Sequence, residues 1–453
     1  MLNAFGNIFK VPELKERVLF TLGIICVVRL GAYIPTPGVD GFILSKIISE
    51  QAARMGGGNL IAFMDMFSGG AMQHCTLFAL GIMPYISASI IMQLLTAVIP
   101  SLEKLAREGE VGHKKIREYT RYGTFFLSMF QSFFIARFLS NPANFGNMVV
   151  VPRPGVLFII CTVMTLTCGT TLLMWLGEQI TEKGVGNGAS LIITINILSR
   201  LPTSFATAWK VIGPGEAGGW GPAKFAIVGI IFVSAIVFVV MITQGERKIP
   251  VQYAKRVIGR KQFAGQSSFI PLRVNYAGVI PIIFASSLLL FPATIGSFWP
   301  QSPFFSSIAR YLSPPHFIHY FLYVLLIVFF CFFWNATVFN PIQMAEHLRQ
   351  NSAFIPGIRP GKTTSDFLDK TMTRITFPGA LFLAGIAIIP DLLAWSKFLG
   401  LPMNVAGFFG GTSLLIIVGV MLDTMRQIEA HLISRHYEGF MKKGKLKGRR
   451  AYY

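Results

Sequence analysis

Long stretches without charge constrain this chain more than any other feature of its sequence. Residues 154–177, 225–245 and 317–339 each hold more than 20 residues without Asp, Glu, Lys or Arg. An α-helix needs about 20 apolar residues to cross a bilayer, so each run is long enough for one span. Only 13% of the residues are charged, whereas soluble proteins carry about 25%. We therefore expect an all-α polytopic membrane protein.

Ten apolar segments are expected to be transmembrane helices. They are 18–34, 72–98, 119–138, 154–176, 186–204, 224–244, 276–293, 317–339, 374–392 and 405–424. The fifth is the weakest, because its charge-free run, 184–199, has only 16 residues and begins with Gly184, Gly186 and Gly188. We expect this span to be short or partly unwound.

The charges predict that both termini lie in the cytoplasm. With ten spans, 30 of the 40 Lys and Arg residues and 15 of the 20 Asp and Glu residues lie on the side of the termini. Lys and Arg mark the cytoplasmic side of membrane proteins. Residues 1–17 are expected to form a cytoplasmic amphipathic segment, and no small-residue cleavage site ends the apolar run that follows.

The stretch 58–96 is unusual for a membrane span. Residues 60–67 form a short apolar segment with one acid, Asp65, and Ser68-Gly69-Gly70 interrupt it before an expected long helix from about Ala71. The short segment cannot cross a bilayer, so it must be buried in protein or line a cavity at membrane depth. This pattern is the first indication of a pathway through the protein.

Two cytoplasmic loops, 246–273 and 340–374, are longer than a connection needs. The first alternates basic and apolar residues, which predicts a β-hairpin with Gly259 near its tip. The second contains AFIPGIRPGKTT, a stiff turn expected to present Arg359 outward. One interpretation of the basic loops and of the basic tail, 425–453, needs no protein partner: Lys and Arg keep these segments in the cytoplasm and are attracted to lipid phosphates. An RNA-containing or acidic partner is the other interpretation of the two loops.

Enzyme chemistry is not expected. The seven histidines are scattered, and HExxH, CxxC, a Ser-His-Asp arrangement and a phosphate loop are absent from the sequence. We therefore expect no catalytic residue, no metal site and no cofactor. The cysteines are expected to be single core thiols; they are Cys26, Cys75, Cys161, Cys168 and Cys331.

Isoleucine spacing within the spans is suggestive without being decisive. Ile82 and Ile86 are one helical turn apart, and Pro84 between them is expected to bend that turn. Ala189 and Ile193 repeat the spacing in the fifth span. Such pairs usually face lipid or the core, so spacing alone selects no site.

Five long motifs resemble the SecY/Sec61 family, the central subunit of the Sec protein-conducting channel. They are ALGIMPYISASIIMQLL, MWLGEQITEKGVGNGAS, AGVIPIIFASSLLLFPATI, FNPIQMAEHLRQNSAFIPGIRPG and FGGTSLLIIVGVMLD, and they recur in the family's order. The resemblance implies two inverted halves of five spans, 18–204 and 224–424, joined by an external linker, 205–223. The halves enclose an hourglass pore, and a short plug helix, 59–70, precedes the second span.

The resemblance also implies roles for individual residues. The constriction is a ring of Ile82, Ile86, Ala189, Ile193, Ile283 and Ile416. The plug carries Leu60, Ile61, Phe63, Met64 and Phe67, and Ser68-Gly69-Gly70 supply its hinge. The lateral gate is assigned to Ser87, Gln93, Asn275 and Ser286. Ribosome and motor contacts fall on Arg260, Lys261 and Arg359, and contacts with SecE on Arg247 and Lys248. Ala189 departs from the family pattern, where a bulkier residue is usual, and either a wider ring or a neighbour filling the gap accommodates it.

The expected function is a passive channel for unfolded polypeptide in the bacterial cytoplasmic membrane, which also releases membrane segments sideways. The implied partners are SecE, SecG, the SecA ATPase motor, the ribosome, signal peptides and nascent chains, the lipid bilayer, YidC and SecDF. A secondary transporter for a small solute is the alternative, although such proteins usually bury ionisable residues in their spans. A structural scaffold in the membrane is a third interpretation, which the plug-like segment disfavours.

Overall fold

The computed structural model is predominantly helical. It describes residues 11–54, 65, 67–145, 148–212, 221–253, 256–258, 261–263, 267–276, 278–298, 303–313, 316–395 and 411–443. The helices are α2 (Pro12–Gly31), α3 (Gly41–Arg54), α5 (Met83–Val98), α6 (Pro100–Arg107), α7 (Glu110–Leu139), the 3₁₀ helix η1 (Pro142–Phe145), α8 (Val156–Lys183), α9 (Gly188–Ser199), α10 (Leu201–Ile212), α11 (Gly221–Gln244), α12 (Ile280–Phe298), α13 (Pro303–Leu312), α14 (Phe317–Val338), α15 (Pro341–Gln350), α16 (Lys362–Trp395) and α18 (Gly411–Lys443). The strands are β1 (Glu246–Tyr253), β2 (Arg256–Ile258), β3 (Lys261–Phe263), β4 (Ser267–Arg273) and β5 (Ala353–Phe354).

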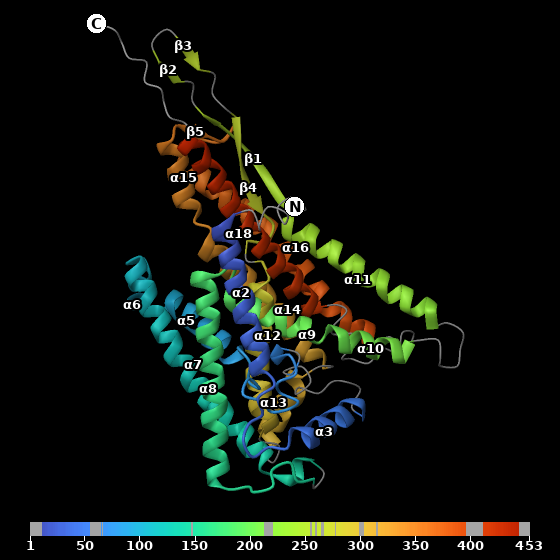
Figure 1. Ribbon diagram of the computed structural model, residues 1–453. Helices are drawn as coiled ribbons and strands as arrows, with labels where there is room; N and C mark the ends of the chain where they lie inside the picture. Colours follow the sequence, from blue (N-terminus) through green and yellow to red (C-terminus); the bar gives the residue numbers. More distant parts are fainter. Residues whose placement is uncertain are drawn as a thin grey trace.

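The long helices form a bundle with two distinct ends (Figure 1). The strands, α15 and the start of α2 lie together at one end, which we call the loop end. The short elements α3, α13 and η1 lie toward the opposite end. The first described residues and the two long loops are therefore on the same side of the bundle.

Five helices of the described part of the chain are long and apolar enough to cross a membrane. They are Val156–Lys183, Gly188–Thr207, Phe317–Gln350, Lys362–Ile389 and Gly411–Ile433. The pair Met83–Val98 and Pro100–Arg107 passes the same test together but is bent by 99° at the break. Ile99 has an extended backbone at this break because the ring of Pro100 disfavours a helical conformation in the residue before it. Two shorter apolar helices are Gly229–Gln244 and Ile280–Ala293.

The predicted long helix from Ala71 is wrong: α5 begins only at Met83. Residues 69–82 form turns, and the backbone N–H of Leu77 donates at 2.8 Å to the carbonyl of Ile34, which follows the end of α2. Gly81 has φ +60°, a conformation that ends helices. Pro84 lies in the first turn of α5, where its missing N–H has no helical partner to lose, so it starts the helix instead of bending it.

The fifth span is partly unwound, as its glycines predict. Residues 184–187 are not helical, and the side chain of Asn187 caps α9 by accepting from the N–H of Ser190 at 3.2 Å. A Cβ on Gly188 would lie 1.9 Å from the backbone oxygen of Gly177. The glycine therefore lets the start of α9 pack directly on α8.

The predicted hairpin of the first loop is present, and the second loop completes its sheet. Strand β1 pairs with β4 on one side and with β5 on the other, both antiparallel. Strands β2 and β3 form a separate ladder, in which Ile258 faces Lys261. Gly259, at the predicted tip, lies outside the described residues. The two loops share a core of buried side chains, namely Ile249, Val251, Leu272, Phe339, Ala353, Ile355, Leu368 and Met372. We call β1, β4, β5, α15 and the start of α16 the loop unit.

Two smaller expectations need correction. Cys75 and Cys331 are buried, but Cys26, Cys161 and Cys168 are exposed on the isolated chain and are not core thiols. A thiol behaves as a small hydrophobe, so an outward position on an apolar span suits it equally well. The described part of the N-terminal segment, from Pro12, is continuous with the first span in α2 instead of forming a separate surface helix.

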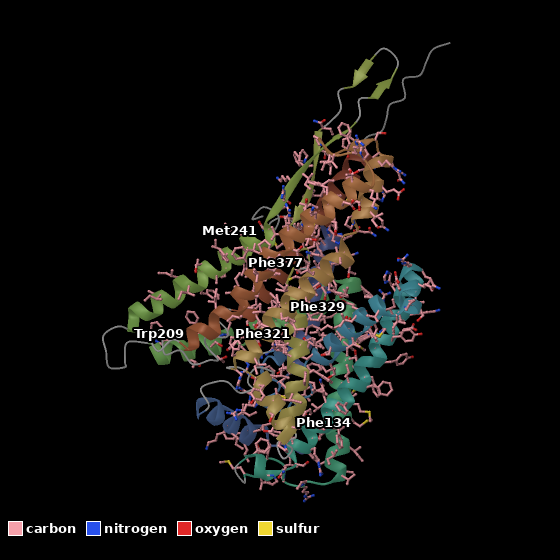
Figure 2. The ribbon with its side chains drawn as sticks, turned by 180° about the vertical axis from the view of Figure 1, so that it is seen from behind. Phe134, Trp209, Met241, Phe321, Phe329 and Phe377 are labelled. Carbon is pink, nitrogen blue, oxygen red and sulfur yellow. The ribbon has the colours of Figure 1, made fainter. Side chains whose placement is uncertain are left out.

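The outside of the bundle carries many large apolar side chains (Figure 2). Trp209, Met241, Phe321, Phe329 and Phe377 are each at least half exposed and are distributed over α10, α11, α14 and α16. Soluble monomers rarely expose apolar surface on this scale. The exposed surface of the helices is therefore suited to lipid.

Candidate functional site

The six residues predicted for the ring lie in one buried apolar cluster. Ile82, Ile86, Ile193, Ile283 and Ile416 are all at most 5% exposed. Ala189 is partly buried and packs against the same cluster. We call these six residues the neck cluster. Residues separated by more than 300 positions in the sequence thus meet in a single apolar region.

Each member of the neck cluster sits at or near the beginning of a helix. Ile82 is the N-cap of α5 and Ile86 lies in its first turn. Ala189 and Ile193 lie in the first two turns of α9, Ile283 in the first turn of α12 and Ile416 in the second turn of α18. The six residues therefore lie at or near the beginnings of four helices from distant parts of the chain.

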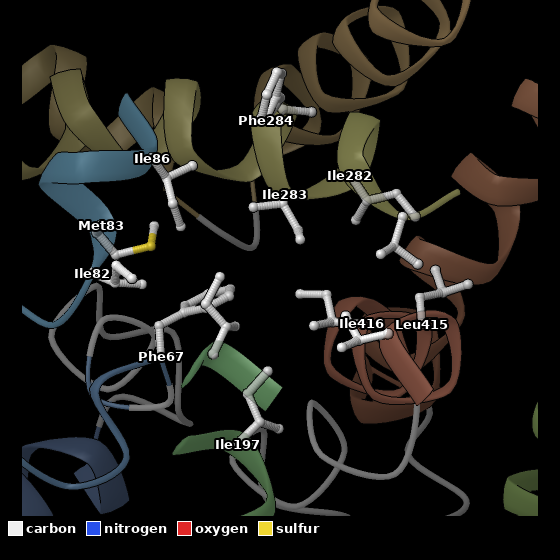
Figure 3. Packing of buried hydrophobic residues seen from close by; sticks show 14 of the residues in the cluster. Phe67, Ile82, Met83, Ile86, Ile197, Ile282, Ile283, Phe284, Leu415 and Ile416 are labelled. Atoms are coloured by element: carbon white, nitrogen blue, oxygen red, sulfur yellow. The ribbon is translucent and has the colours of Figure 1, made fainter. Parts of the chain in front are cut away.

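Three members of the neck cluster, Ile86, Ile283 and Ile416, point toward a common centre (Figure 3). Ile86 comes from α5, Ile283 from α12 and Ile416 from α18, and Phe67 approaches them from the segment before α5. All four are aliphatic or aromatic, so none of their side chains offers a hydrogen bond. The centre of the molecule is therefore an apolar cluster of side chains from distant parts of the chain.

The predicted plug falls largely outside the described residues. Leu60, Ile61, Phe63 and Met64 are not described, whereas Phe67 is 2% exposed and belongs to the same core as the neck cluster. Its backbone oxygen accepts from Nδ2 of Asn196 in α9 at 3.1 Å.

Polar contacts are also found at Asp65, two residues before Phe67, and at Asn196. Asp65 is 2% exposed, forms an ion pair with Arg200 and accepts from the N–H of Gln73 at 2.9 Å. Nη1 of Arg29 donates to Oδ1 of Asn196 at 3.4 Å. The sequence singled out Asp65, but it gave no partner for it, because Arg200 is 135 positions away.

Two of the four predicted gate residues lie on α5 and two lie in or before α12. The two helices pack against each other. Ser87 and Gln93 are half-buried on α5, and Nε2 of Gln93 donates to Oγ of Ser89 at 3.3 Å. Ser286 is buried in α12 and donates to the carbonyl of Ile283 at 3.0 Å.

Asn275 has a local role in the structure. Its Nδ2 donates to the carbonyl of Gly278 at 2.6 Å, in the turn that leads into α12. Gly278 has φ +59°, so this hydrogen bond stabilises a turn that favours glycine. Asn275 thus helps to set where α12 begins.

The predicted partner contacts lie at the loop end. Arg247 and Lys248 are exposed on β1, and Nζ of Lys248 lies 3.5 Å from Glu246 and 5.8 Å from the ring centre of Phe269. Arg359 is exposed in the turn between β5 and α16. Lys261 begins β3, where only its backbone is described, and Arg260 lies outside the described residues.

Sequence signals for helix starts could have identified the neck cluster more directly. Pro84 and Pro281 lie in the first turns of α5 and α12, and Asn187 caps α9. Each signal predicts where a helix begins, and each is followed within a few residues by a member of the cluster. The meeting of these helix beginnings in one cluster could not be predicted, because it depends on how the helices pack.

The described part of the chain has five or six helices that are long and apolar enough to span a membrane, and large apolar side chains are exposed on its surface. The chain is therefore a multi-pass α-helical membrane protein. The family model described as SecY matches residues 76–425, more than half of the chain. The chain belongs to the SecY family, and the predicted resemblance is confirmed. It is accordingly a protein of the bacterial inner membrane.

Curated bacterial relatives match over nearly their whole length. The chain is 46% identical to Protein translocase subunit SecY of Escherichia coli K12 over 439 residues, which is 96% of each chain. It is 45% identical over 453 residues to Protein translocase subunit SecY of Streptomyces coelicolor, covering 98% of this chain and 100% of that one.

Solved structures support the fold at low sequence identity. A structure described as "The structure of a protein conducting channel" matches with a TM-score of 0.64 and 17% identity, covering 93% of each chain. "Sec61 in the Canine ribosome-channel complex from the endoplasmic reticulum" matches with a TM-score of 0.60 and 16% identity, again over 93% of each chain.

Proposed function

We propose that this chain is the channel subunit of a protein translocase, which passes unfolded secretory polypeptides across the inner membrane and releases transmembrane segments sideways into the bilayer. The observation that carries the proposal is the neck cluster. Five buried isoleucines from α5, α9, α12, α18 and the residue before α5 gather in one apolar cluster. The names of the curated relatives point to the same function.

The chemistry of the neck suits a polypeptide whose sequence varies. Aliphatic side chains can fit around a moving chain and offer no hydrogen bond that would hold it. A narrow apolar constriction also excludes water and ions when it is empty, because such constrictions dewet. In the closed channel, Phe67 and the rest of the plug segment, 59–70, seal the neck and move aside when a substrate enters.

The proposed architecture has ten spans in two inverted halves of five. The helices that overlap the ten predicted segments are α2, α5, α7, α8, α9 with α10, α11, α12, α14, α16 and α18. Ser87 and Ser286, on the contacting helices α5 and α12, line the lateral gate between the halves. The N- and C-termini and the loop unit face the cytoplasm, in keeping with the excess of Lys and Arg in those segments.

The proposed partners bind at the loop unit and around the spans. Arg260, Lys261 and Arg359 contact the ribosome or the SecA motor, and Arg247 and Lys248 contact SecE. SecG, signal peptides, nascent chains, YidC and SecDF complete the set implied by the family. One structural relative of the chain is described as a ribosome-channel complex, which supports the ribosome as a partner in general. A motor or ribosome supplies the energy, since no nucleotide motif occurs in the sequence.

A reconstitution experiment tests the function. Vesicles containing the purified chain with its small membrane subunits, supplied with the motor and ATP, are expected to protect a secretory precursor from external protease. Vesicles without ATP provide the control. If the precursor stays fully accessible while the vesicles accumulate a small solute against its gradient, the chain is a secondary transporter instead.

A further inference from the structure

The unwound turn of the fifth span, residues 184–187, is packed between the first helix and the last one. The side chain of Val185 is 4% exposed and forms an apolar cluster with Leu14 of α2 and Ile428 of α18. The first three residues of the turn are all buried. A segment without regular helical hydrogen bonds therefore lies inside the protein, where its backbone needs other partners.

Side chains of the two neighbouring helices supply these partners. The N–H of Val185 donates to Oγ1 of Thr21 in α2 at 3.1 Å. The N–H of Gly186 donates to Oε1 of Gln427 in α18 at 3.0 Å. The turn is thus held by hydrogen bonds to helices that are 164 and 241 positions away in the sequence.

The turn leads directly into the neck cluster. The N–H of Gly188, which begins α9, donates to Oγ1 of Thr181 in α8 at 2.9 Å. Ala189, a member of the neck cluster, follows immediately. A Cβ on Gly177 of α8 would lie 3.5 Å from the backbone nitrogen of Ala189 and 3.6 Å from Cδ1 of Ile82. The end of α8 and the start of α9 therefore contact each other beside the neck.

Thr21 makes the more constrained of the two contacts with the turn. Its residue is 7% exposed, and its hydroxyl donates to the carbonyl of Arg17 at 2.9 Å while it accepts from Val185. A Cβ on Gly184 would lie only 2.4 Å from this hydroxyl oxygen, so the turn approaches Thr21 as closely as a glycine allows. Gln427 is exposed, so water can replace its amide.

The position of the turn determines where α9 begins. Apolar packing around Val185 is not directional, whereas a hydrogen bond requires a narrow range of distances and angles. Without the Thr21 hydroxyl, the buried N–H of Val185 has lost its acceptor, which costs more than the bond itself contributes. The turn then shifts toward water or another acceptor, and the start of α9, with Ala189 and Ile193, shifts with it.

We propose that Thr21 is a positioning residue of the neck: its hydroxyl fixes the unwound turn and thereby where α9 presents Ala189 and Ile193 to the rest of the neck cluster. The proposal rests on the channel function proposed above. The second hydrogen bond to the turn comes from α18, which also carries Ile416 of the neck. Two helices of the neck are thus joined at a second point, outside the neck itself.

Two measurements on the purified complex test this role. Hydrogen exchange over residues 178–192 reports on the turn, and ion flux through reconstituted vesicles reports on the neck. We would compare the wild type with Thr21→Val, which keeps the shape and removes the acceptor, and with Thr21→Ser, which keeps the acceptor. Thr124→Val is the matched control, because Thr124 is fully buried in α7 and donates to the carbonyl of Thr120 one turn back, at 2.8 Å.

Thr21→Val is expected to speed exchange over residues 178–192 and to raise the resting ion leak by about fivefold or more, because a buried N–H without an acceptor favours the shifted turn. Thr21→Ser should keep both values near the wild type, and so should Thr124→Val. Membrane abundance and motor-driven translocation of a precursor should persist in Thr21→Val, which separates a misplaced neck from an unfolded subunit.

Several results would overturn the proposal. Wild-type exchange in Thr21→Val would mean that the hydroxyl does not hold the turn, and faster exchange with a wild-type leak would mean that the turn does not position the neck. A leak in Thr21→Ser or in Thr124→Val equal to that in Thr21→Val would also overturn it.

A second variant keeps the proposal testable if Thr21→Val fails to accumulate. Gln427→Leu removes the other acceptor of the turn from its exposed side, and it is expected to change exchange and leak in the same direction but less. Wild-type values of both in Gln427→Leu would overturn the proposal. If wild-type vesicles fail to translocate a precursor, the proposed channel function is wrong, whereas the exchange measurement still decides whether Thr21 holds the turn.

Discussion

The neck cluster and the loop unit are both built from buried aliphatic side chains, yet they present opposite surfaces. In the neck, Ile283 and Ile416 turn apolar groups toward the centre of the molecule. In the loop unit, Ile249 and Leu272 are buried beneath strands whose other residues, such as Arg247, face outward. Burial of aliphatic side chains thus produces a surface without side-chain hydrogen-bond donors or acceptors in the neck. In the loop unit, it produces a rigid support for exposed charged residues.

The two regions also differ in how far apart their residues lie in the sequence. The loop unit joins two loops, and its hairpin is defined by neighbouring strands in register, from Glu246 opposite Arg273 to Gln252 opposite Ser267. The neck needs the beginnings of four helices from distant parts of the chain to meet in one buried cluster. Local pairing can therefore assemble the loop unit, whereas only the packing of the whole bundle can assemble the neck. Substitutions in the two regions should separate sealing from partner binding.

The largest effect is expected at the neck. Ile86→Asn or Ile283→Asn places an amide in a buried apolar site, which draws in water and opens a path for ions. We expect the resting conductance to rise by about tenfold or more, because the dewetted barrier is lost. Single-channel recordings measure it, with Ile86→Val as the control that keeps the site apolar. No added conductance in either Asn variant would refute the seal.

A large but different effect is expected at the tip of the loop unit. Arg359→Glu reverses an exposed charge in the turn after β5, so it should cripple motor-driven secretion while membrane abundance and ion leak stay near wild type. Arg349→Glu is the matched control, because Arg349 is also exposed but lies in α15, where it pairs with Glu346. Pulse-chase secretion measures the effect. Equal secretion in Arg359→Glu and the wild type would mean that the turn is not a motor contact.

The core of the loop unit should respond with a moderate loss of stability. Leu272 is 0% exposed in β4, so Leu272→Ala leaves a cavity and should lower the stability of the sheet by about 2–5 kcal/mol. Phe269→Ala in the same strand is the control, because that side chain is 61% exposed. Hydrogen exchange of the β1–β4 amides reports the difference. Similar protection in both variants would argue against a shared core between the loops.

The smallest effect is expected at the lateral gate, where only proximity is tested. Cysteines at Ser87 and Ser286, in a chain whose native cysteines are replaced, should cross-link to a signal sequence held in a stalled precursor. A cysteine at the exposed Ser234 of α11 provides the control. Cross-linking at Ser234 alone would show that the lateral gate does not lie between α5 and α12.

The hairpin and the unwound start of the fifth span were predictable because their causes are local. Alternating residues between Glu246 and Arg273 specify a strand pair, and Gly184, Gly186 and Gly188 interrupt a helix wherever they occur. The start of α5 was predicted 12 residues too early, at Ala71 instead of Met83. Hydrophobicity alone does not distinguish a helix from buried turns, and most of residues 71–82 are buried in protein.

By itself, the sequence determined the class of protein, the approximate positions of the apolar helices, the basic loops and, through its motifs, the family. Length, hydropathy and charge are sufficient for the class, the apolar helices and the basic loops, because the bilayer imposes the same requirements on every chain that crosses it. Only the tertiary structure decided that the neck residues meet, that β5 joins the hairpin and that Asp65 pairs with Arg200. Each of these joins residues far apart in the chain, and their meeting depends on how helices and strands pack in three dimensions.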